Sequence, residues 1–448
     1  MLATEDFARH AARLLVADDE DLVSAIEQEN ARQQNSLMLV ASSSVTDPSV
    51  LACLATSSMN VTAEGYPGAR YHAGCEAIDP IEQLAVDRAR ALFGARYANV
   101  QPHSATTANY AVLSALLDPG DVVLGMRLNH GGHLTHGYSV AYSGTYFTAV
   151  NYGLDEHGRI DYEEVAALAE AHRPKLIVCG ATAYPRTVDF ARFRAIADSV
   201  GALLMADISH IAGLVAAGLH PSPVDHAHIT TTCTHKQLAG PRGGIILSGR
   251  DADTVLPGTG RTIAKTLDRA VFPFFQGAPV LPAIAAKARA FALAATDTYR
   301  ATAQRILDDS AALAAELTAL GHDVVTGGSD NHIVLLDLTR DGVSGIAAER
   351  ALESIGIVVN KNRIPGDSRP ATVTSGVRIG TNAVAQRGLG PAEMRVCARI
   401  IHSVLTAMRR EGERDFTLDE FTAAGLRAEV EKLAAQFPLP RYLPGGRS

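Results

Sequence analysis

Short apolar runs alternate with amphipathic stretches from about residue 79 onward. Runs typical of strands, such as DVVLGM, PKLIVCG, ALLMAD, ITTTC and GGIILSG, are separated by stretches typical of helices, such as DYEEVAALAEAHR and DFARFRAIADSVG. A mostly parallel sheet needs helices between its strands, and these helices cover its faces. The alternation therefore predicts an α/β fold.

The pattern changes after Pro282. An Ala-rich stretch predicts one long helix that reaches about Leu320, and the strand-like runs HIVLLDL, GIVVNKN and SGVRIG then alternate with helices such as PAEMRVCARIIHSVLTAMRR. This mixture favours a second, smaller α+β unit at the C-terminus. We therefore expect an N-terminal arm over residues 1–55, a large domain over 56–290 and a small domain over 291–448.

The composition narrows the class of protein. The chain has 448 residues, 47% of them hydrophobic, and a formal net charge of -8. The sequence has no long Lys/Arg run of the kind that binds nucleic acid or an anionic membrane. No apolar run approaches the ~20 residues needed to span a bilayer, and the N-terminus lacks the pattern of a signal peptide. Five scattered cysteines argue against a disulfide framework. We expect a cytoplasmic protein with a small-molecule partner.

The run THKQLAGPRGG is the strongest chemical signal in the chain. Its Lys236 can form a Schiff base with pyridoxal 5'-phosphate (PLP), and the short residues around it leave room for a ring and a phosphate. Asp207 ends the run ALLMAD, where a carboxylate can keep a PLP pyridine nitrogen protonated. A surface lysine and a helix-capping aspartate are the alternatives, so the prediction depends on further clusters.

Two such clusters fit the same cofactor. Ser104 and Thr106 stand where a helix begins, so free N–H groups and hydroxyls there can bind a phosphate. The run NHGGHLTHG offers His130, His133 and His136. Three histidines could also bind zinc, but the Gly pair and the lack of an adjacent carboxylate argue against a zinc site. We expect an imidazole ring stacked on the cofactor and no metal. Arg378, in VTSGVRIG, can bind a carboxylate through paired hydrogen bonds.

Longer motifs extend these clusters over nearly the whole chain. AEGYPGARY, CEAIDPIEQLAVDRARALFG, YANVQPHS, HGGHLTHG, DISHIAGLVAAG, THKQLAGPRGG and TSGVRIGT resemble the serine hydroxymethyltransferase family. The resemblance implies PLP fold type I, the aspartate-aminotransferase-like architecture, with a mostly parallel seven-stranded sheet in the large, PLP-binding domain. It also implies a homodimer with shared active sites, possibly assembled into a tetramer, that uses PLP as cofactor and tetrahydrofolate as co-substrate.

The resemblance assigns roles position by position. The catalytic residues that it implies are Lys236 as the Schiff-base lysine, Asp207 as the pyridine partner, His133 as the stacking ring and Glu64 as the acid/base group. The cofactor-binding positions are Ser104, Ala105, Thr106, His133, Asp207, His210, Thr234, His235, Lys236 and Gly277. The substrate-binding positions are Ser42, Thr62, Glu64, Tyr71, His72 and Arg378. The folate-binding positions are Leu128, Gly132, Leu134 and Asn362.

Departures from the family pattern cluster on one side of this site. The replaced positions are Ser43, Ser44, Thr62, His72, Ala73, Asn129, Phe274 and Phe275. At Thr62 the family has a tyrosine, whose loss leaves room for an extra carbon on Cα of the amino acid. We therefore expect hydroxymethyl transfer by retro-aldol cleavage at Cα–Cβ, with 2-methylserine as donor and D-alanine as product, as the resemblance to α-methylserine hydroxymethyltransferases implies.

Other readings of the same residues stay open. They are an ordinary L-serine/glycine hydroxymethyltransferase, in which Thr62 and His72 repack around serine, a folate-independent aldolase or L-threonine transaldolase, and a non-catalytic PLP-binding protein.

Overall fold

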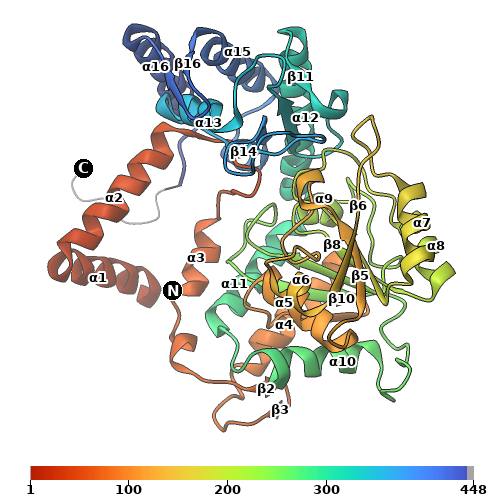
Figure 1. The fold of residues 1–448 in the computed structure, drawn as a ribbon. Helices are drawn as coiled ribbons and strands as arrows, with labels where there is room; N and C mark the ends of the chain where they lie inside the picture. The colour runs from red at the N-terminus through yellow and green to blue at the C-terminus, as the bar shows by residue number, and fades with distance from the viewer. Residues whose placement is uncertain (1, 441–448) are drawn as a thin grey trace.

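The large sheet has seven strands, in the order β4-β10-β9-β8-β7-β5-β6. Its strands are β4 (Tyr97–Asn99), β5 (Val122–Met126), β6 (Thr148–Tyr152), β7 (Leu176–Cys179), β8 (Leu203–Asp207), β9 (Ile229–Cys233) and β10 (Gly244–Ser248). Neighbouring strands from β9 to β6 are parallel, and β10 runs antiparallel to both β9 and β4. The computed structural model describes residues 2–440 of the chain and confirms the predicted mostly parallel sheet (Figure 1).

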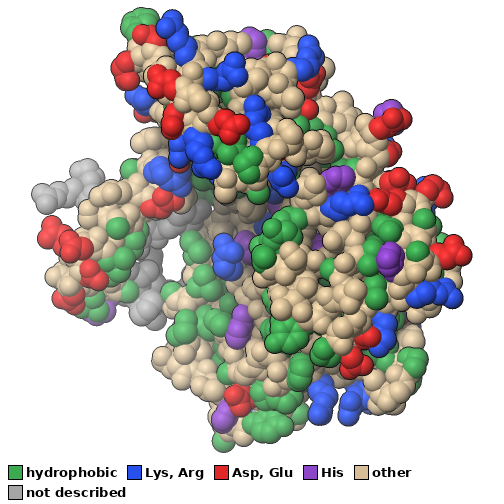
Figure 2. Space-filling view, in the orientation of Figure 1, with side chains coloured by type: hydrophobic (Ala, Val, Ile, Leu, Met, Phe, Trp, Pro, Cys, Tyr) green, Lys and Arg blue, Asp and Glu red, His purple; other side chains and the backbone are tan. Residues whose placement is uncertain are grey.

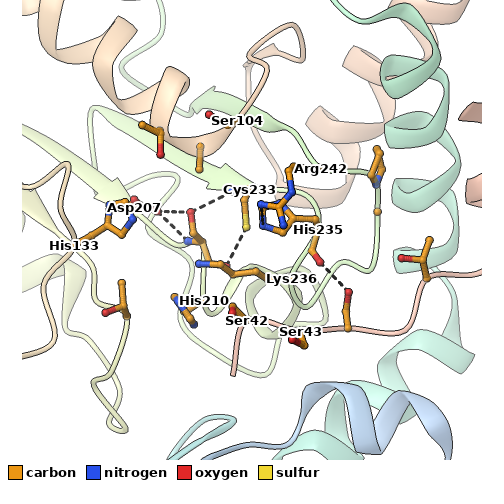
Figure 3. Close-up of a pocket in the computed structure, with 18 of the residues that line it drawn as sticks. Ser42, Ser43, Ser104, His133, Asp207, His210, Cys233, His235, Lys236 and Arg242 are labelled. Carbon is orange, nitrogen blue, oxygen red and sulfur yellow. Dashed lines mark hydrogen bonds between the residues drawn. The ribbon is translucent and has the colours of Figure 1, made fainter. Parts of the chain in front are cut away.

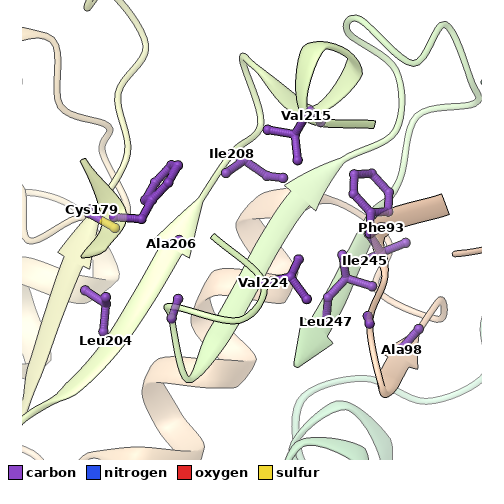
Figure 4. Close-up of a cluster of buried hydrophobic side chains, with 14 of the residues drawn as sticks. Phe93, Ala98, Cys179, Leu204, Ala206, Ile208, Val215, Val224, Ile245 and Leu247 are labelled. Atoms are coloured by element: carbon purple, nitrogen blue, oxygen red, sulfur yellow. The ribbon is translucent and has the colours of Figure 1, made fainter. Parts of the chain in front are cut away.

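Helices cover both faces of this sheet. They are α4 (Asp79–Phe93), α5 (Ala105–Leu116), α6 (Tyr142–Tyr146), α7 (Tyr162–His172), α8 (Phe190–Val200), α9 (Ala212–Ala216), α10 (Ile263–Arg269) and α11 (Leu281–Ala294). Successive strand residues face opposite sides, so Leu204 and Ala206 join one core with α4, α7, α8 and α11, while Met205 joins another with α5 and α10 (Figure 4). Burial on both faces explains why β5, β7, β8 and β10 read as mainly apolar runs.

The C-terminal part has its own hydrophobic core and an antiparallel sheet of order β11-β12-β15-β14. Its strands are β11 (Asp323–Val324), β12 (Ile333–Asp337), β13 (Ile357–Val358), β14 (Asn360–Asn362), β15 (Gly376–Gly380), β16 (Arg409–Glu411) and β17 (Asp415–Thr417). Its helices are α12 (Asp297–Ala319), α13 (Gly345–Ser354), α14 (Asn382–Arg387), α15 (Pro391–Ala407) and α16 (Glu420–Gln436). A smaller α+β unit is therefore present, as the sequence pattern predicted.

The structure divides two of the predicted segments in this region. The Ala-rich stretch after Pro282 forms two helices, α11 and α12, because Thr296 caps a new helix by accepting a hydrogen bond from the N–H of Tyr299 at 3.2 Å. The run GIVVNKN forms two short strands, because β13 pairs with β1 while β14 pairs with β15. Neither the cap nor the change of partner is visible in the hydrophobic pattern.

The N-terminal region connects to both parts. Its elements are α1 (Leu2–Asp18), α2 (Glu20–Asn35), β1 (Leu37–Met38), α3 (Pro48–Leu54), the 3₁₀ turn Ser57–Asn60, β2 (Gly65–Tyr66) and β3 (Ala69–Arg70). Strand β1 pairs with β13, and Leu37 and Leu39 lie in the C-terminal core. Helices α1 and α2 project from the rest of the molecule in Figure 1. Among the described residues, no helix has the length and apolar character required to cross a membrane.

Asp309 on α12 gives the C-terminal part a pH-dependent stability. The side chain is fully buried, neither carboxylate oxygen has a hydrogen-bond partner among the described residues, and burial raises its pKa to about 8. In the unfolded chain an aspartate loses its proton near pH ~4. Between these values the unfolded chain releases a proton that the folded chain keeps, so the free energy of unfolding falls as pH rises, by at most about 1.4 kcal/mol per pH unit.

Thermal unfolding of Asp309→Asn between pH 5 and 8 tests this expectation. Relative to Asp309→Asn, the wild-type midpoint should fall with rising pH in this window, because only the wild-type side chain at 309 titrates. Asp308→Asn is the matched control, since Asp308 is the exposed neighbour on the same helix. Identical pH profiles for wild type and Asp309→Asn contradict the assignment.

Candidate active site at the carboxyl edge of the large sheet

Asp207 ends β8, and three residues surround its carboxylate with hydrogen-bonding groups. Its carboxylate accepts hydrogen bonds from Asn109 Nδ2 at 2.8 Å and from Ser209 Oγ and N at 2.6 and 3.0 Å, and it lies 3.2 Å from His136 Nε2. Burial alone raises the pKa of Asp207, but the bonds from His136 and Ser209 outweigh it and hold that pKa well below its ordinary value. This buried side chain therefore stays a carboxylate across the neutral range.

Lys236 follows β9, the strand next to β8, and lines the same cavity as Asp207. The cavity has a volume of about 830 Å³ and lies between the large sheet and the C-terminal part (Figures 2 and 3). Burial lowers the pKa of Lys236. A lysine of lowered pKa has more free amine at neutral pH, which is the form that attacks an aldehyde.

Ser104 begins α5 at one end of this cavity, where Ala105 and Thr106 also line the wall. The Ser104 hydroxyl caps the helix by accepting from the N–H of Thr107 at 3.0 Å. His235 lines the wall as well, and its buried Nδ1 has no hydrogen-bond partner among the described residues, while its Nε2 lies 3.2 Å from Arg242 Nη1. A helix start, hydroxyls and an unpartnered imidazole nitrogen together suit an anionic group.

His133 lies at the junction of this cavity with a second one of about 430 Å³. Its Nδ1 is 2.8 Å from the Thr135 hydroxyl, and burial lowers its pKa to about 4. The ring is therefore neutral near pH 7 and suited to stacking. His133, His136 and Asp207 offer ligand atoms within 4.8 Å of one another, so the fold brings Asp207 to two histidines that lie about 70 positions before it in the sequence.

The C-terminal part closes the cavity with Arg378 on β15. Its Nε donates to Asn360 Oδ1 at 3.0 Å and its Nη1 to the Thr182 carbonyl, and burial lowers its pKa to about 10. It remains a cation at neutral pH. Ser42 and Asn362 line the same cavity, so a predicted substrate position and a predicted folate position meet there.

His210 also lines this cavity, as predicted, and it is backed by a histidine that the sequence did not single out. His332, at the start of β12, stacks on it with ring centroids 5.7 Å apart. Thr234 is placed differently from the other predicted cofactor positions. Its hydroxyl donates to the Pro241 carbonyl at 2.6 Å, and it does not line the cavity.

The predicted folate positions divide between the two cavities. Leu128 lines the second cavity together with Arg127, Asn129 and Arg363, whereas Asn362 lines the first. Gly132 and Leu134 line neither cavity, and the Leu134 side chain is exposed. The structure therefore brings only part of this set to the Lys236 cavity.

A second group of predicted residues lies apart from Lys236. Glu64 precedes the β2–β3 hairpin, its Oε2 is 3.5 Å from His72 Nε2, and both side chains are partly exposed. The members of the group that do not line the Lys236 cavity are Thr62, Glu64, Tyr71, His72 and Gly277. On this chain the predicted site residues therefore fall into separate groups, and only some of them line the Lys236 cavity.

Sequence reasoning missed the residues that hold Asp207. Asn109 lies on α5 and also donates to the Thr135 hydroxyl at 2.8 Å, and Ser209 follows Asp207 by two residues. Thr231 on β9 extends the network by donating to Asn109 Oδ1 at 2.6 Å. These residue types are common in any sequence, and only folding brings them together. The sequence indicated His136 only as one of three histidines that could bind zinc.

The cavity fits PLP on three independent grounds. It offers an amine at Lys236, a buried carboxylate at Asp207, and an anion-binding end at Ser104 with an unpartnered nitrogen of His235. These three features lie at the carboxyl edge of a mostly parallel sheet, where α/β proteins bind ligands. Fold and site together define the class of PLP-dependent enzymes of fold type I.

Comparison with known proteins then gives the family. The serine hydroxymethyltransferase family model matches residues 15–401. The serine hydroxymethyltransferase of Acinetobacter baylyi (strain ATCC 33305 / BD413 / ADP1) is 50% identical over 422 residues, which cover 94% of this chain and 97% of the relative. The enzyme of the same name from Acinetobacter baumannii is 49% identical over the same shares. The chain belongs to the serine hydroxymethyltransferase family, PLP-dependent hydroxymethyltransferases with tetrahydrofolate as co-substrate.

Proposed function

We propose that this enzyme takes a serine-type amino acid with an extra carbon on Cα, 2-methylserine, and transfers its hydroxymethyl carbon to tetrahydrofolate, leaving D-alanine. Thr62 carries this proposal. A tyrosine at this position would place a ring where threonine places one methyl and one hydroxyl group. Thr62 is exposed on its own chain, on the surface that the homodimer proposed below would bring to the partner's cavity.

The chain's own residues have separate tasks in this reaction. Bound PLP would supply the sink for the electron pair released when the Cα–Cβ bond breaks. Lys236 would hold the cofactor covalently, and Asp207 would keep its ring nitrogen protonated. Arg378 would bind the donor's carboxylate, because its guanidinium group lines the same cavity. Glu64 would take the proton of the departing hydroxymethyl group, and tetrahydrofolate would accept the formaldehyde unit.

A homodimer would unite the two surfaces of the site. Glu64, Thr62 and His72 lie apart from the Lys236 cavity of their own chain, and a Lys236 cavity without an acid/base group is incomplete. We infer that each hairpin serves the cavity of the partner subunit. The hairpin is rigid enough for this, since Arg70 pairs with Asp79 at 2.8 Å and with Glu82 at 2.6 Å.

An ordinary L-serine hydroxymethyltransferase is the second candidate. The two Acinetobacter relatives carry that name and match nearly the whole chain. In this case Thr62 and His72 would repack around serine without admitting a larger donor. The two candidates differ in one measurable quantity, the ratio of kcat/KM for 2-methylserine to that for L-serine.

Steady-state rates with L-serine, 2-methylserine, L-threonine and D-alanine, each with and without tetrahydrofolate, test the proposal. We expect 2-methylserine to be preferred, and activity to require tetrahydrofolate. Thr62→Tyr restores the ring and should shift the ratio toward L-serine by ~10- to 100-fold, the range for one carbon in a shaped pocket. Folate-independent cleavage would instead indicate an aldolase or transaldolase.

Thr298→Tyr is the matched control, because Thr298 is exposed on α12 and far along the chain from every site residue. It should leave the ratio unchanged. A clear preference of the wild-type enzyme for L-serine contradicts the proposed donor and favours the second candidate.

A further inference from the structure

Lys287 is a buried lysine that none of the roles above uses. It lies in the middle of α11, and only 2% of its surface is exposed. Buried lysines are rare unless their charge is bound, and burial lowers the pKa of this one to about 7. Among the described residues it forms no ion pair, so its partners must be dipoles.

Three backbone carbonyls surround the Lys287 ammonium group. Its Nζ donates to the carbonyls of Val100 at 2.6 Å, Gly244 at 2.9 Å and Pro102 at 3.1 Å. In its protonated form the side chain has three N–H donors, one for each of these carbonyls, so the three contacts favour the charged form. The lysine thereby ties the segment after β4 to the start of β10.

Two glycines make room for this arrangement. A Cβ on Gly243 would lie 2.4 Å from Lys287 Cε, and a Cβ on Gly244 would lie 2.4 Å from the Ser104 carbonyl. Any larger residue at 243 would displace the ammonium group. The Gly244 N–H also donates to the Pro102 carbonyl at 3.0 Å, so this carbonyl is fixed twice.

The segment held by Lys287 leads in one direction to the cavity. Pro102 is two residues before Ser104, which begins α5 at the anion-binding end. Gly244 pairs with Cys233 at the end of β9, three residues before Lys236. The ammonium group thus supports both backbone segments that carry cavity residues.

The same segment leads in the other direction to Glu64. Gln101 stands between the two anchored carbonyls, and its Nε2 donates to the Gly65 carbonyl at 2.8 Å and to Glu82 Oε1 at 2.7 Å. Arg70 also donates to the Gly65 carbonyl, at 2.8 Å. Gly65 directly follows Glu64, so the backbone carrying the acid/base group is bound to the segment that Lys287 holds.

We propose that Lys287 is a positioning residue whose buried ammonium group fixes the backbone of residues 100–102. Through this segment it positions Ser104 in the cavity of its own subunit. Through the same segment it positions Glu64 on the hairpin that serves the partner subunit. The proposal rests on the shared-cavity homodimer inferred above. Lys287 does not line the Lys236 cavity, so it acts through the backbone of this segment.

Mixed dimers separate the two effects. The experiment uses a dimer of one Lys236→Ala subunit and one Glu64→Gln subunit, purified through different tags. This dimer has one working cavity. The Glu64→Gln subunit supplies its Lys236 and Ser104, and the Lys236→Ala subunit supplies its Glu64. Lys287→Met in the Glu64→Gln subunit should weaken PLP binding at Lys236 ~10-fold. Lys287→Met in the Lys236→Ala subunit should leave that affinity unchanged and lower kcat ~10-fold.

PLP affinity is read by borohydride trapping on the Lys236 peptide, which does not depend on turnover. Lys265→Met, which changes an exposed lysine on α10, is the control and should alter neither quantity. Equal effects from both placements of Lys287→Met, or no effect from either, overturn the proposal. An inactive mixed dimer without any change at 287 instead refutes the shared cavity, so the two failures are distinguishable.

Gly243→Ala gives a second variant in case Lys287→Met does not fold. It keeps the lysine and displaces its ammonium group, because the new Cβ meets Lys287 Cε. The same division between PLP affinity and kcat is expected from the two placements. Unchanged affinity and unchanged kcat in both mixed dimers overturn the proposal.

Discussion

Lys236→Ala should lower kcat/KM by at least ~10³-fold, the scale seen when a covalent catalytic group is removed. Among the described residues that line the cavity, Lys236 is the only lysine, so no other amine of this set can replace it. Its pKa is lowered by burial, which makes the free amine available at neutral pH. Borohydride reduction followed by mass spectrometry of the peptides checks the cause: PLP is trapped on Lys236 in wild type and on no lysine of the cavity in the variant.

Mixed dimers test whether Lys236 and Glu64 of different subunits form one site, as proposed. Neither Lys236→Ala nor Glu64→Gln should be active alone, but a random mixture should recover about one quarter of wild-type activity, because half of the dimers then hold one intact cavity of two. Circular dichroism establishes that each parent is folded. Residual activity of Lys236→Ala near the wild-type level, or trapped PLP on another lysine, contradicts the role given to Lys236.

The fold was predictable because its signal is repeated along the chain. Strands β7, β8 and β10 are almost wholly buried, and each reads as a mainly apolar run in the sequence. Short pairings carry no such signal. The two residues of β1 pair with β13 more than 300 positions away, and nothing in the run LM marks that partner.

The site was predictable where chemistry follows a strand. Asp207 and Lys236 end or follow neighbouring parallel strands, and such strand ends meet at one edge. Asn109 and His332 were missed because their roles depend on contacts across the fold, with Asp207 and His210 respectively. Glu64 was assigned by resemblance alone, and on its own chain it does not line the Lys236 cavity, so its role depends on the proposed homodimer.

Asp207→Ala should be the second severe variant, with kcat lowered by ~10³-fold, because removing a preorganised charge from a buried site removes transition-state stabilisation. The structure surrounds this carboxylate with donors from Asn109, His136 and Ser209. In Asp207→Asn an amide N–H would face some of these donors, so this conservative change should also lower kcat, by ~10²-fold. PLP should remain covalently trapped on Lys236 in both variants, since the amine is intact.

The pH profile distinguishes a charge role from a packing role. The pKa of Asp207 lies well below its ordinary value, so the group stays ionised from pH 5 to 9 and contributes no decline in wild-type activity within that range. Asp253→Asn, at an exposed aspartate, is the control and should leave kcat unchanged. If Asp207→Asn keeps wild-type kcat while trapping PLP normally, the negative charge at 207 is not needed, and the network around it serves only to pack the end of β8.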